Sequence, residues 1–188
     1  LSPDLIVVAA YGKVLPEEIL DTPQYGSINV HSSLLPKYRG AAPINLAILN
    51  GETETGVSIM YMAKELDAGD IILQKTTAIR ETENAQELTE RLAELGAQAL
   101  SQAVTELTEG KAVRAPQAAE KATYAAMLSR EMSTIDWNRS AHEISCQVRG
   151  LIPWPCASTD VIHGEMMKLY AVLEAGEATD AAPGEIVA

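Results

Sequence analysis

The segment of residues 56–62, GVSIMYM, is the feature that most constrains the fold of this chain. A strand points successive side chains to opposite faces of its sheet, and here apolar residues occupy both sets of positions. Such a strand needs cover on both faces, which is typical of mostly parallel sheets with helices packed on each side. The segment therefore predicts an α/β domain with a doubly wound, mostly parallel sheet.

Apolar runs and turn residues place the neighbouring elements along the chain. We predict further strands at residues 5–10, 27–31 and 71–79, and short helices at residues 16–21 and 43–50. Asn84 and Glu87 form a predicted capping box for a long helix. The apolar stripe of this helix recurs at three- and four-residue steps as far as Leu107, and Gly110 supplies its stop.

The chain changes character after this helix. Residues 111–130 lack a clear period and predict a linker. Beyond it we predict a helix at 141–150, a Pro-Trp-Pro corner at 153–155, and strands at 157–162, 166–172 and 184–188. Short strands separated by Gly and Pro favour a small β-rich second domain. The predicted boundaries are 1–110, 111–130 and 131–188.

Composition excludes several classes of protein. With 188 residues and 47% hydrophobic content, the chain is long and apolar enough for a packed core. No apolar run reaches the length of a membrane span. Cys146 and Cys156 are too far apart for a zinc site, and they favour a reduced, cytoplasmic setting. Because the chain opens on Leu1 without an initiator Met, we expect it to be a piece of a longer protein.

The distribution of charge is more informative than its total. The formal net charge of −12 argues against nucleic acid binding by the chain as a whole, since phosphate groups attract concentrated Lys and Arg. Residues 111–130 are the exception, because they hold four basic residues and one acidic residue. The linker is therefore the predicted cationic track.

Two polar clusters follow predicted strands. Asn29 and His31 are two positions apart, so an extended strand points both side chains the same way, and Asp67 and Asp70 follow residues 56–62. An Asn can stabilise an oxyanion, a His can exchange a proton, and an Asp can orient that His, a set suited to acyl transfer to an amine. The alternative is a hydrogen-bonded structural His and a turn-forming Asp. A serine hydrolase is excluded because there is no Gly-x-Ser-x-Gly elbow.

Two longer stretches carry a resemblance. NVHSSLLPKYRGAAPI begins at residue 29, and NGETETGVSIMYMAKELDAGDIILQ begins at residue 50. Both resemble the folate-dependent formyltransferases, in particular the branch that formylates methionyl-tRNA. The resemblance implies Asn29, His31 and Asp67 as catalytic residues. It also implies a Rossmann-like sheet followed by an OB-like β-barrel domain, with both ends of the family's chain missing.

The resemblance also implies a co-substrate. Ser33, Leu34, Leu35 and Pro36 match the family's folate-binding signature, and 10-formyltetrahydrofolate is the implied formyl donor, with no metal. Residues 11–16 and 63–67 resemble the loops that enclose the pterin ring. The leucines of the signature, taken as exposed, would form an apolar wall for this flat ring.

The implied acceptor is methionyl initiator tRNA, with no membrane and no obligate protein partner evident. Lys37 and Arg39 are expected at the pocket mouth, and Lys111, Arg114 and Lys121, here named the linker cations, are expected on the tRNA. Sugar-nucleotide formyltransferases share several of these motifs but typically show Arg-Ala-Pro where this chain has Ala-Ala-Pro at 41–43. The open alternatives are an amino sugar nucleotide formyltransferase, a formyltetrahydrofolate hydrolase, and a non-catalytic folate- or RNA-binding module.

Overall fold

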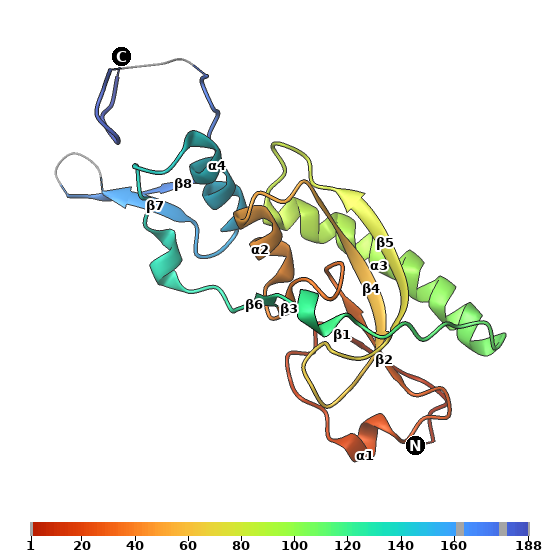
Figure 1. Cartoon of the computed structure of the whole chain (residues 1–188). Coiled ribbons are helices and arrows are strands. Elements are labelled where there is room, and N and C mark those ends of the chain that lie inside the picture. Colours follow the sequence, from red (N-terminus) through yellow and green to blue (C-terminus); the bar gives the residue numbers. More distant parts are fainter. Residues whose placement is uncertain (1, 161–163, 177–179, 188) are drawn as a thin grey trace.

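A four-stranded sheet forms the centre of the first half of the chain. The computed structural model describes residues 2–160, 164–176 and 180–187 (Figure 1). The strands are β1 (Ile6–Ala9), β2 (Ser27–His31), β4 (Glu54–Tyr61) and β5 (Ile71–Ala78), in the order β1-β2-β4-β5. β1 and β2 are parallel, whereas β4 is antiparallel to both β2 and β5. The sheet is therefore mixed.

The predicted α/β class is confirmed, but the predicted majority of parallel pairings is wrong for the described strands. β4 is buried on both faces because each face has its own cover. Val57 faces the long helix α3 (Ala85–Thr108), near Gly96, and the loop before α2 covers the other face through Leu34, which lies close to Gly56. Burial on both faces requires two layers of cover and does not fix the direction of the neighbouring strand.

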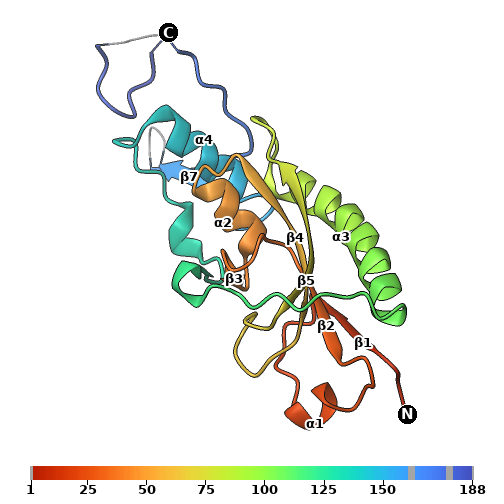
Figure 2. The ribbon, with the colours of Figure 1, turned by 45° about the vertical axis from the view of Figure 1, so that its right-hand side comes forward.

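Helix α3 provides most of the core against the sheet (Figure 2). Its predicted capping box is confirmed, since the Asn84 side chain accepts backbone N–H bonds and the Glu87 carboxylate accepts one from the backbone N–H of Asn84. A cap of this kind stabilises a helix by about 1 kcal/mol. Leu88 and Leu92 lie on the buried stripe, and the chain leaves the helix at Gly110 with a φ of +70°.

The shorter helices α1 (Glu17–Leu20) and α2 (Pro43–Leu49) lie near the two ends of the sheet. α2 lies between the sheet and α4 (Ala141–Gly150) in both ribbon views (Figures 1 and 2). Asn45 donates to the carbonyl of Gly150 at 2.8 Å, where the two helices pack closely. This contact joins the two halves of the chain.

The segment predicted as a linker is tied to the first half. Ala115 pairs with Ile71 at the edge of β5, and β6 (Tyr124–Ala125) pairs in parallel with β3 (Arg39–Gly40). Two short 3-10 helices, η1 (Ala119–Lys121) and η2 (Arg130–Ser133), complete the crossing. The linker therefore runs over the loop that follows β2.

The last part of the chain contains a small second core. Ile144, Val148 and Leu151 pack with Ala157, the first residue of β7 (Ala157–Asp160), which pairs antiparallel with β8 (Met166–Leu169). β7 contains every described residue of its prediction, since residues 161 and 162 lie outside the described residues. β8 is shorter than predicted, because residues 170–172 are not in a strand. The predicted strand at 184–188 is wrong for residues 184–187, which form a turn and coil; residue 188 lies outside the described residues.

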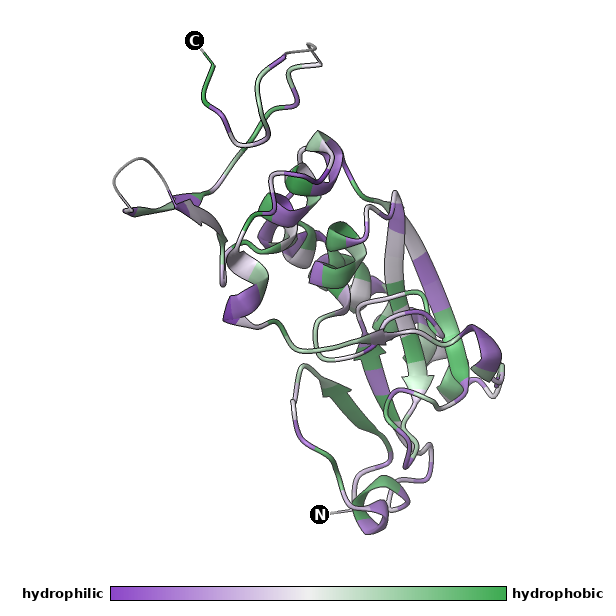
Figure 3. Cartoon of the chain, turned by 60° about the vertical axis from the view of Figure 1, so that its left-hand side comes forward, coloured by the Kyte–Doolittle hydropathy of each residue, from purple (hydrophilic) through white to green (hydrophobic). Residues whose placement is uncertain are grey.

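Both halves of the chain contain apolar segments. Figure 3 shows apolar residues, in green, both in the strands of the main sheet and in the helices of the two halves. Within the described ranges the second domain has one antiparallel strand pair and no closed barrel. No helix in the described part of the chain is long and apolar enough to cross a membrane.

Candidate active site

β2 separates its side chains between the core and a polar face. Ile28 is fully buried, and Val30 lies against Gly96 of α3. Because strand side chains alternate, Asn29 and His31 point to the opposite face, as predicted from their spacing. Hydrophobic burial on one face therefore fixes the direction in which both polar side chains point.

His31 lies between two acceptors. Its Nε2 is 2.9 Å from the Tyr38 carbonyl oxygen, and its Nδ1 is 3.6 Å from Asp67 Oδ2. A carbonyl oxygen only accepts, so Nε2 carries a proton and donates it. The distance of 3.6 Å between Nδ1 and Oδ2 is longer than a hydrogen bond, so the Asp67 carboxylate lies beside the imidazole as a charged neighbour.

Asp67 reaches His31 by a route that the sequence did not reveal. In the mostly parallel sheet that we predicted, the ends of β2 and β4 would lie at the same edge, but β4 runs antiparallel to β2, and Tyr61 pairs with Ile28. His31 is three residues further along β2, or roughly 10 Å away. The loop of residues 62–70 must therefore return along the sheet to bring its carboxylate to the imidazole.

The carboxylate of Asp67 has a second partner. Gly40 donates its backbone N–H to Asp67 Oδ2 at 2.8 Å. Gly40 has a φ of +113°, and a Cβ at this position would lie 2.6 Å from the carbonyl oxygen of Ala125 in β6. Only glycine lets the loop lie this close to β6 while it offers its N–H to the carboxylate.

The predicted folate segment, Ser33 to Pro36, is ordered by polar contacts beneath it. Ser58 donates to the Ser33 carbonyl and accepts from the Leu35 N–H, and Gln74 donates to the Leu35 carbonyl. The expectation of exposed leucines is wrong, because Leu35 is 4% exposed and Leu34 packs over Gly56. The segment presents a fixed backbone rather than a wall of free leucine side chains.

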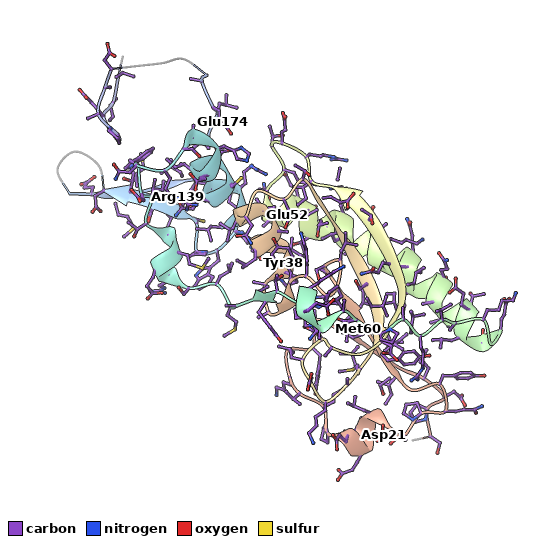
Figure 4. The ribbon with its side chains drawn as sticks, viewed as in Figure 1. Asp21, Tyr38, Glu52, Met60, Arg139 and Glu174 are labelled. Atoms are coloured by element: carbon purple, nitrogen blue, oxygen red, sulfur yellow. The ribbon has the colours of Figure 1, made fainter. Side chains whose placement is uncertain are left out.

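Lys37 and Tyr38 share a carboxylate. Lys37 Nζ lies 3.1 Å from Glu52 Oε1, and the Tyr38 hydroxyl donates to the same oxygen at 2.8 Å (Figure 4). Burial raises the pKa of the Tyr38 phenol above its usual value. Burial would also raise the pKa of Glu52, but the hydrogen bonds from Tyr38 and Lys37 outweigh it and the net shift of the pKa is downward.

We expected Arg39 at the exposed mouth of the pocket, but its side chain is buried. It is 5% exposed, and its Nε and one terminal nitrogen both donate to Gln117 Oε1, at 3.1 and 2.7 Å. Its guanidinium is therefore unavailable to a phosphate in this structure. Our sequence analysis did not identify Gln117 as a site residue. The signal that could have pointed to it is weak: a polar amide side chain next to Pro116 in a linker rich in Ala.

Each of the three linker cations has different surroundings in the structure. Lys111 pairs with Glu109 at 2.7 Å, and the guanidinium carbon of Arg114 lies 3.7 Å from the centre of the Tyr61 ring. Lys121 is exposed at the end of η1. Among the residues that the structure describes, no group of three or more His, Cys, Asp and Glu side chains is placed to hold a metal ion.

Comparison with known protein families identifies the family to which this chain belongs. Residues 1–104 match the family model described as formyl transferase, and residues 127–188 match the model of the formyl transferase C-terminal domain. The chain belongs to the formyl transferase family. This confirms, at the level of the family, the resemblance that we inferred from the two long motifs. The two family models together cover both halves of the chain.

Its curated relatives include proteins named methionyl-tRNA formyltransferase. The protein from Caldanaerobacter subterraneus subsp. tengcongensis is 54% identical over 170 residues, which cover 90% of this chain and 55% of the relative. The protein from Bacillus subtilis is 47% identical over 188 residues, covering 100% of this chain and 59% of the relative. The chain thus spans somewhat more than half the length of the curated relatives it matches.

Solved structures share the fold at lower identity. A sugar N-formyltransferase from Shewanella matches with a TM-score of 0.74 and 21% identity, over 93% of this chain and 71% of that one. HypX from Aquifex aeolicus, in complex with tetrahydrofolic acid, matches with a TM-score of 0.79 and 22% identity, over 99% of this chain and 32% of that one. These likenesses establish the formyl transferase fold.

Proposed function

We propose that the protein containing this chain transfers a formyl group from 10-formyltetrahydrofolate to the α-amine of methionyl initiator tRNA. The observation that carries the proposal is the pairing of His31 with Asp67 on the polar face that also holds Asn29. The identity of 46–54% to proteins named methionyl-tRNA formyltransferase supports this acceptor. The bacterial relatives agree with the expected cytoplasmic setting of bacterial type, and an organelle remains open.

The chemistry begins with attack of the neutral amine on the formyl carbon. The Asn29 amide donates to the oxyanion that develops on the formyl oxygen, and the protonated His31 supplies positive charge beside it. His31 Nε2 already donates to the Tyr38 carbonyl, so in this arrangement the ring acts through its charge and its position. Asp67 keeps that charge in place and helps to move the proton of the attacking amine toward the leaving folate nitrogen.

Three backbone segments are the proposed folate site. Ser33 to Pro36 contribute polar backbone groups, and the loops of residues 11–16 and 63–67 contribute the walls. Lys64 lies 3.3 Å from Glu17, which places the second loop beside the start of α1. Val14 and Leu66 are 88% and 60% exposed, so these loops offer the apolar surface that a flat ring can cover.

The linker cations and Lys37 are the proposed contacts to tRNA. The ion pairs of Lys37 with Glu52 and of Lys111 with Glu109 are exposed enough for each Lys to exchange its carboxylate for a phosphate at little cost. Arg39 is withdrawn from this set because it is buried. The cationic linker offsets the negative charge of the rest of the chain where the acceptor would approach.

The test is formyl transfer by the full-length protein with three acceptors. Methionyl initiator tRNA, an amino sugar nucleotide and water are each incubated with 10-formyltetrahydrofolate. We expect rapid formylation of the tRNA alone. Preferred formylation of the sugar nucleotide, or release of formate to water at a comparable rate, would refute the proposed acceptor, and folate binding without turnover would refute catalysis.

A further inference from the structure

The side chain of Gln117 joins three segments of the candidate active site. Its Nε2 donates to the carbonyl oxygens of Asp67 and Gly69, each at 2.8 Å. Its Oε1 accepts two hydrogen bonds from Arg39. A single amide of the linker therefore uses both its donors and its acceptor to connect the loop of residues 62–70 with the segment that follows β2.

Arg39 determines which way this amide points. A guanidinium has only donors, so the Gln117 oxygen must face Arg39 and the NH₂ group must face the two carbonyls. Arg39 itself is buried, and its backbone pairs with Tyr124 in the β3–β6 ladder. The orientation of Gln117 is therefore set by a charge that is fixed within the fold.

The main chain at Asp67 needs such support. Asp67 has a φ of +50°, a left-handed conformation that persists in a non-glycine residue where the surroundings over-determine it. Gly69 lies so close to the preceding strand that a Cβ at this position would clash with the Tyr61 carbonyl oxygen. The two carbonyls that Gln117 binds belong to these two constrained positions, so the amide holds the loop where the Asp67 carboxylate meets Gly40 and His31.

We propose that Gln117 is a positioning residue for the reaction: oriented by Arg39, it fixes the main chain of Asp67 so that the carboxylate stays against His31. The inference rests on the proposed function, and it adds that a residue of the linker helps to determine the rate of formyl transfer. Gln117 makes its hydrogen bonds with the protein's own residues, so its proposed role is exerted through Asp67.

Two variants of the full-length protein separate the halves of this contact. Gln117→Ala removes all four hydrogen bonds. Gln117→Glu keeps an acceptor for Arg39 but replaces the two donors with an oxygen that repels the carbonyls of Asp67 and Gly69. We expect both to lower kcat about 10- to 100-fold with KM for folate and tRNA within about twofold, since a small displacement of a reacting group has effects of this size. Gln98→Ala and Gln98→Glu, on the exposed face of α3, are the matched controls and should retain wild-type kcat.

A double-mutant cycle distinguishes positioning from general destabilisation. In the Asp67→Asn protein the carboxylate to be positioned is already gone, so adding Gln117→Ala should lower the residual kcat less than about threefold. Equal losses in the two backgrounds would overturn the inference, as would a Gln117→Glu variant with wild-type kcat.

Amide exchange gives a readout that does not depend on turnover. The Gly40 N–H is protected by the Asp67 carboxylate, so its exchange in Gln117→Ala should be at least about tenfold faster than in wild type, whereas Gln98→Ala should leave it unchanged. Unchanged exchange at Gly40 would refute the positioning role. Absence of formyl transfer in the wild-type protein would refute the proposed function instead, and the exchange result would still stand.

Discussion

Replacing Asp67 by Asn tests the charge at the centre of the candidate site while preserving its shape. The Asn oxygen can still accept the Gly40 N–H, which lies 2.8 Å from Oδ2 in the wild type. What disappears is the negative charge 3.6 Å from His31 Nδ1. The variant therefore removes one interaction and keeps its neighbour.

The size of the effect follows from this distance. Two unit charges 3.6 Å apart attract by about 4–5 kcal/mol at an effective dielectric constant of about 20, an upper bound for the loss. Loss of a single preorganised contact to developing charge commonly costs about 2.7–4 kcal/mol, or 10²- to 10³-fold in rate. We expect a decrease of this size in the rate constant of formyl transfer for Asp67→Asn.

The assay is single-turnover formylation of methionyl initiator tRNA by the full-length protein at saturating 10-formyltetrahydrofolate. Asp70→Asn is the matched control, because it makes the same change on the same loop. Asp70 accepts the Tyr61 N–H through its backbone carbonyl, which the substitution leaves in place. It should stay within about threefold of wild type. An Asp67→Asn rate within threefold of wild type, or an equal loss in Asp70→Asn, would refute the assigned role of Asp67.

Three further outcomes are expected. Asn29→Ala and His31→Ala should each lower kcat about 10²-fold or more without unfolding the protein, as measured by turnover and circular dichroism; near-normal transfer by His31→Ala would contradict the mechanism. Neutralising the linker cations should raise KM for tRNA several-fold, leave KM for folate unchanged and flatten the dependence of KM on salt, and an unaltered salt dependence would count against the tRNA contact. Glu83 is 4% exposed and accepts two hydrogen bonds from Arg91, which outweigh the effect of burial and hold the pKa of Glu83 below its ordinary value of 4.5. This stabilisation is complete above about pH 4.5 and is lost as the pH falls through the lowered pKa, so Glu83→Gln should cost about 1–3 kcal/mol in urea unfolding at pH 7 and less at pH 3; a pH-independent difference would contradict the argument.

Local rules predicted the parts of the fold that depend on neighbouring residues. The capping box at Asn84 and the shared face of Asn29 and His31 follow from spacings of two or three positions. The antiparallel course of β4 and the burial of Arg39 depend on contacts between segments far apart in sequence. The partner of Arg39 is 78 positions away, and neither a period nor a propensity carries that information.

The parallel pairing of β3 with β6 is only two residues long, yet it alters how the protein can be divided. A protein truncated at residue 110 keeps Asn29, His31 and Asp67 but loses Gln117 and the strand against which Gly40 lies. The side chains that we propose for catalysis would all be present, but without the backbone segments that hold them in place. The smallest segment that contains the whole candidate site therefore extends past the sheet to residue 125. Recombination or proteolysis near residue 110 would separate the proposed catalytic residues from the segments that position them.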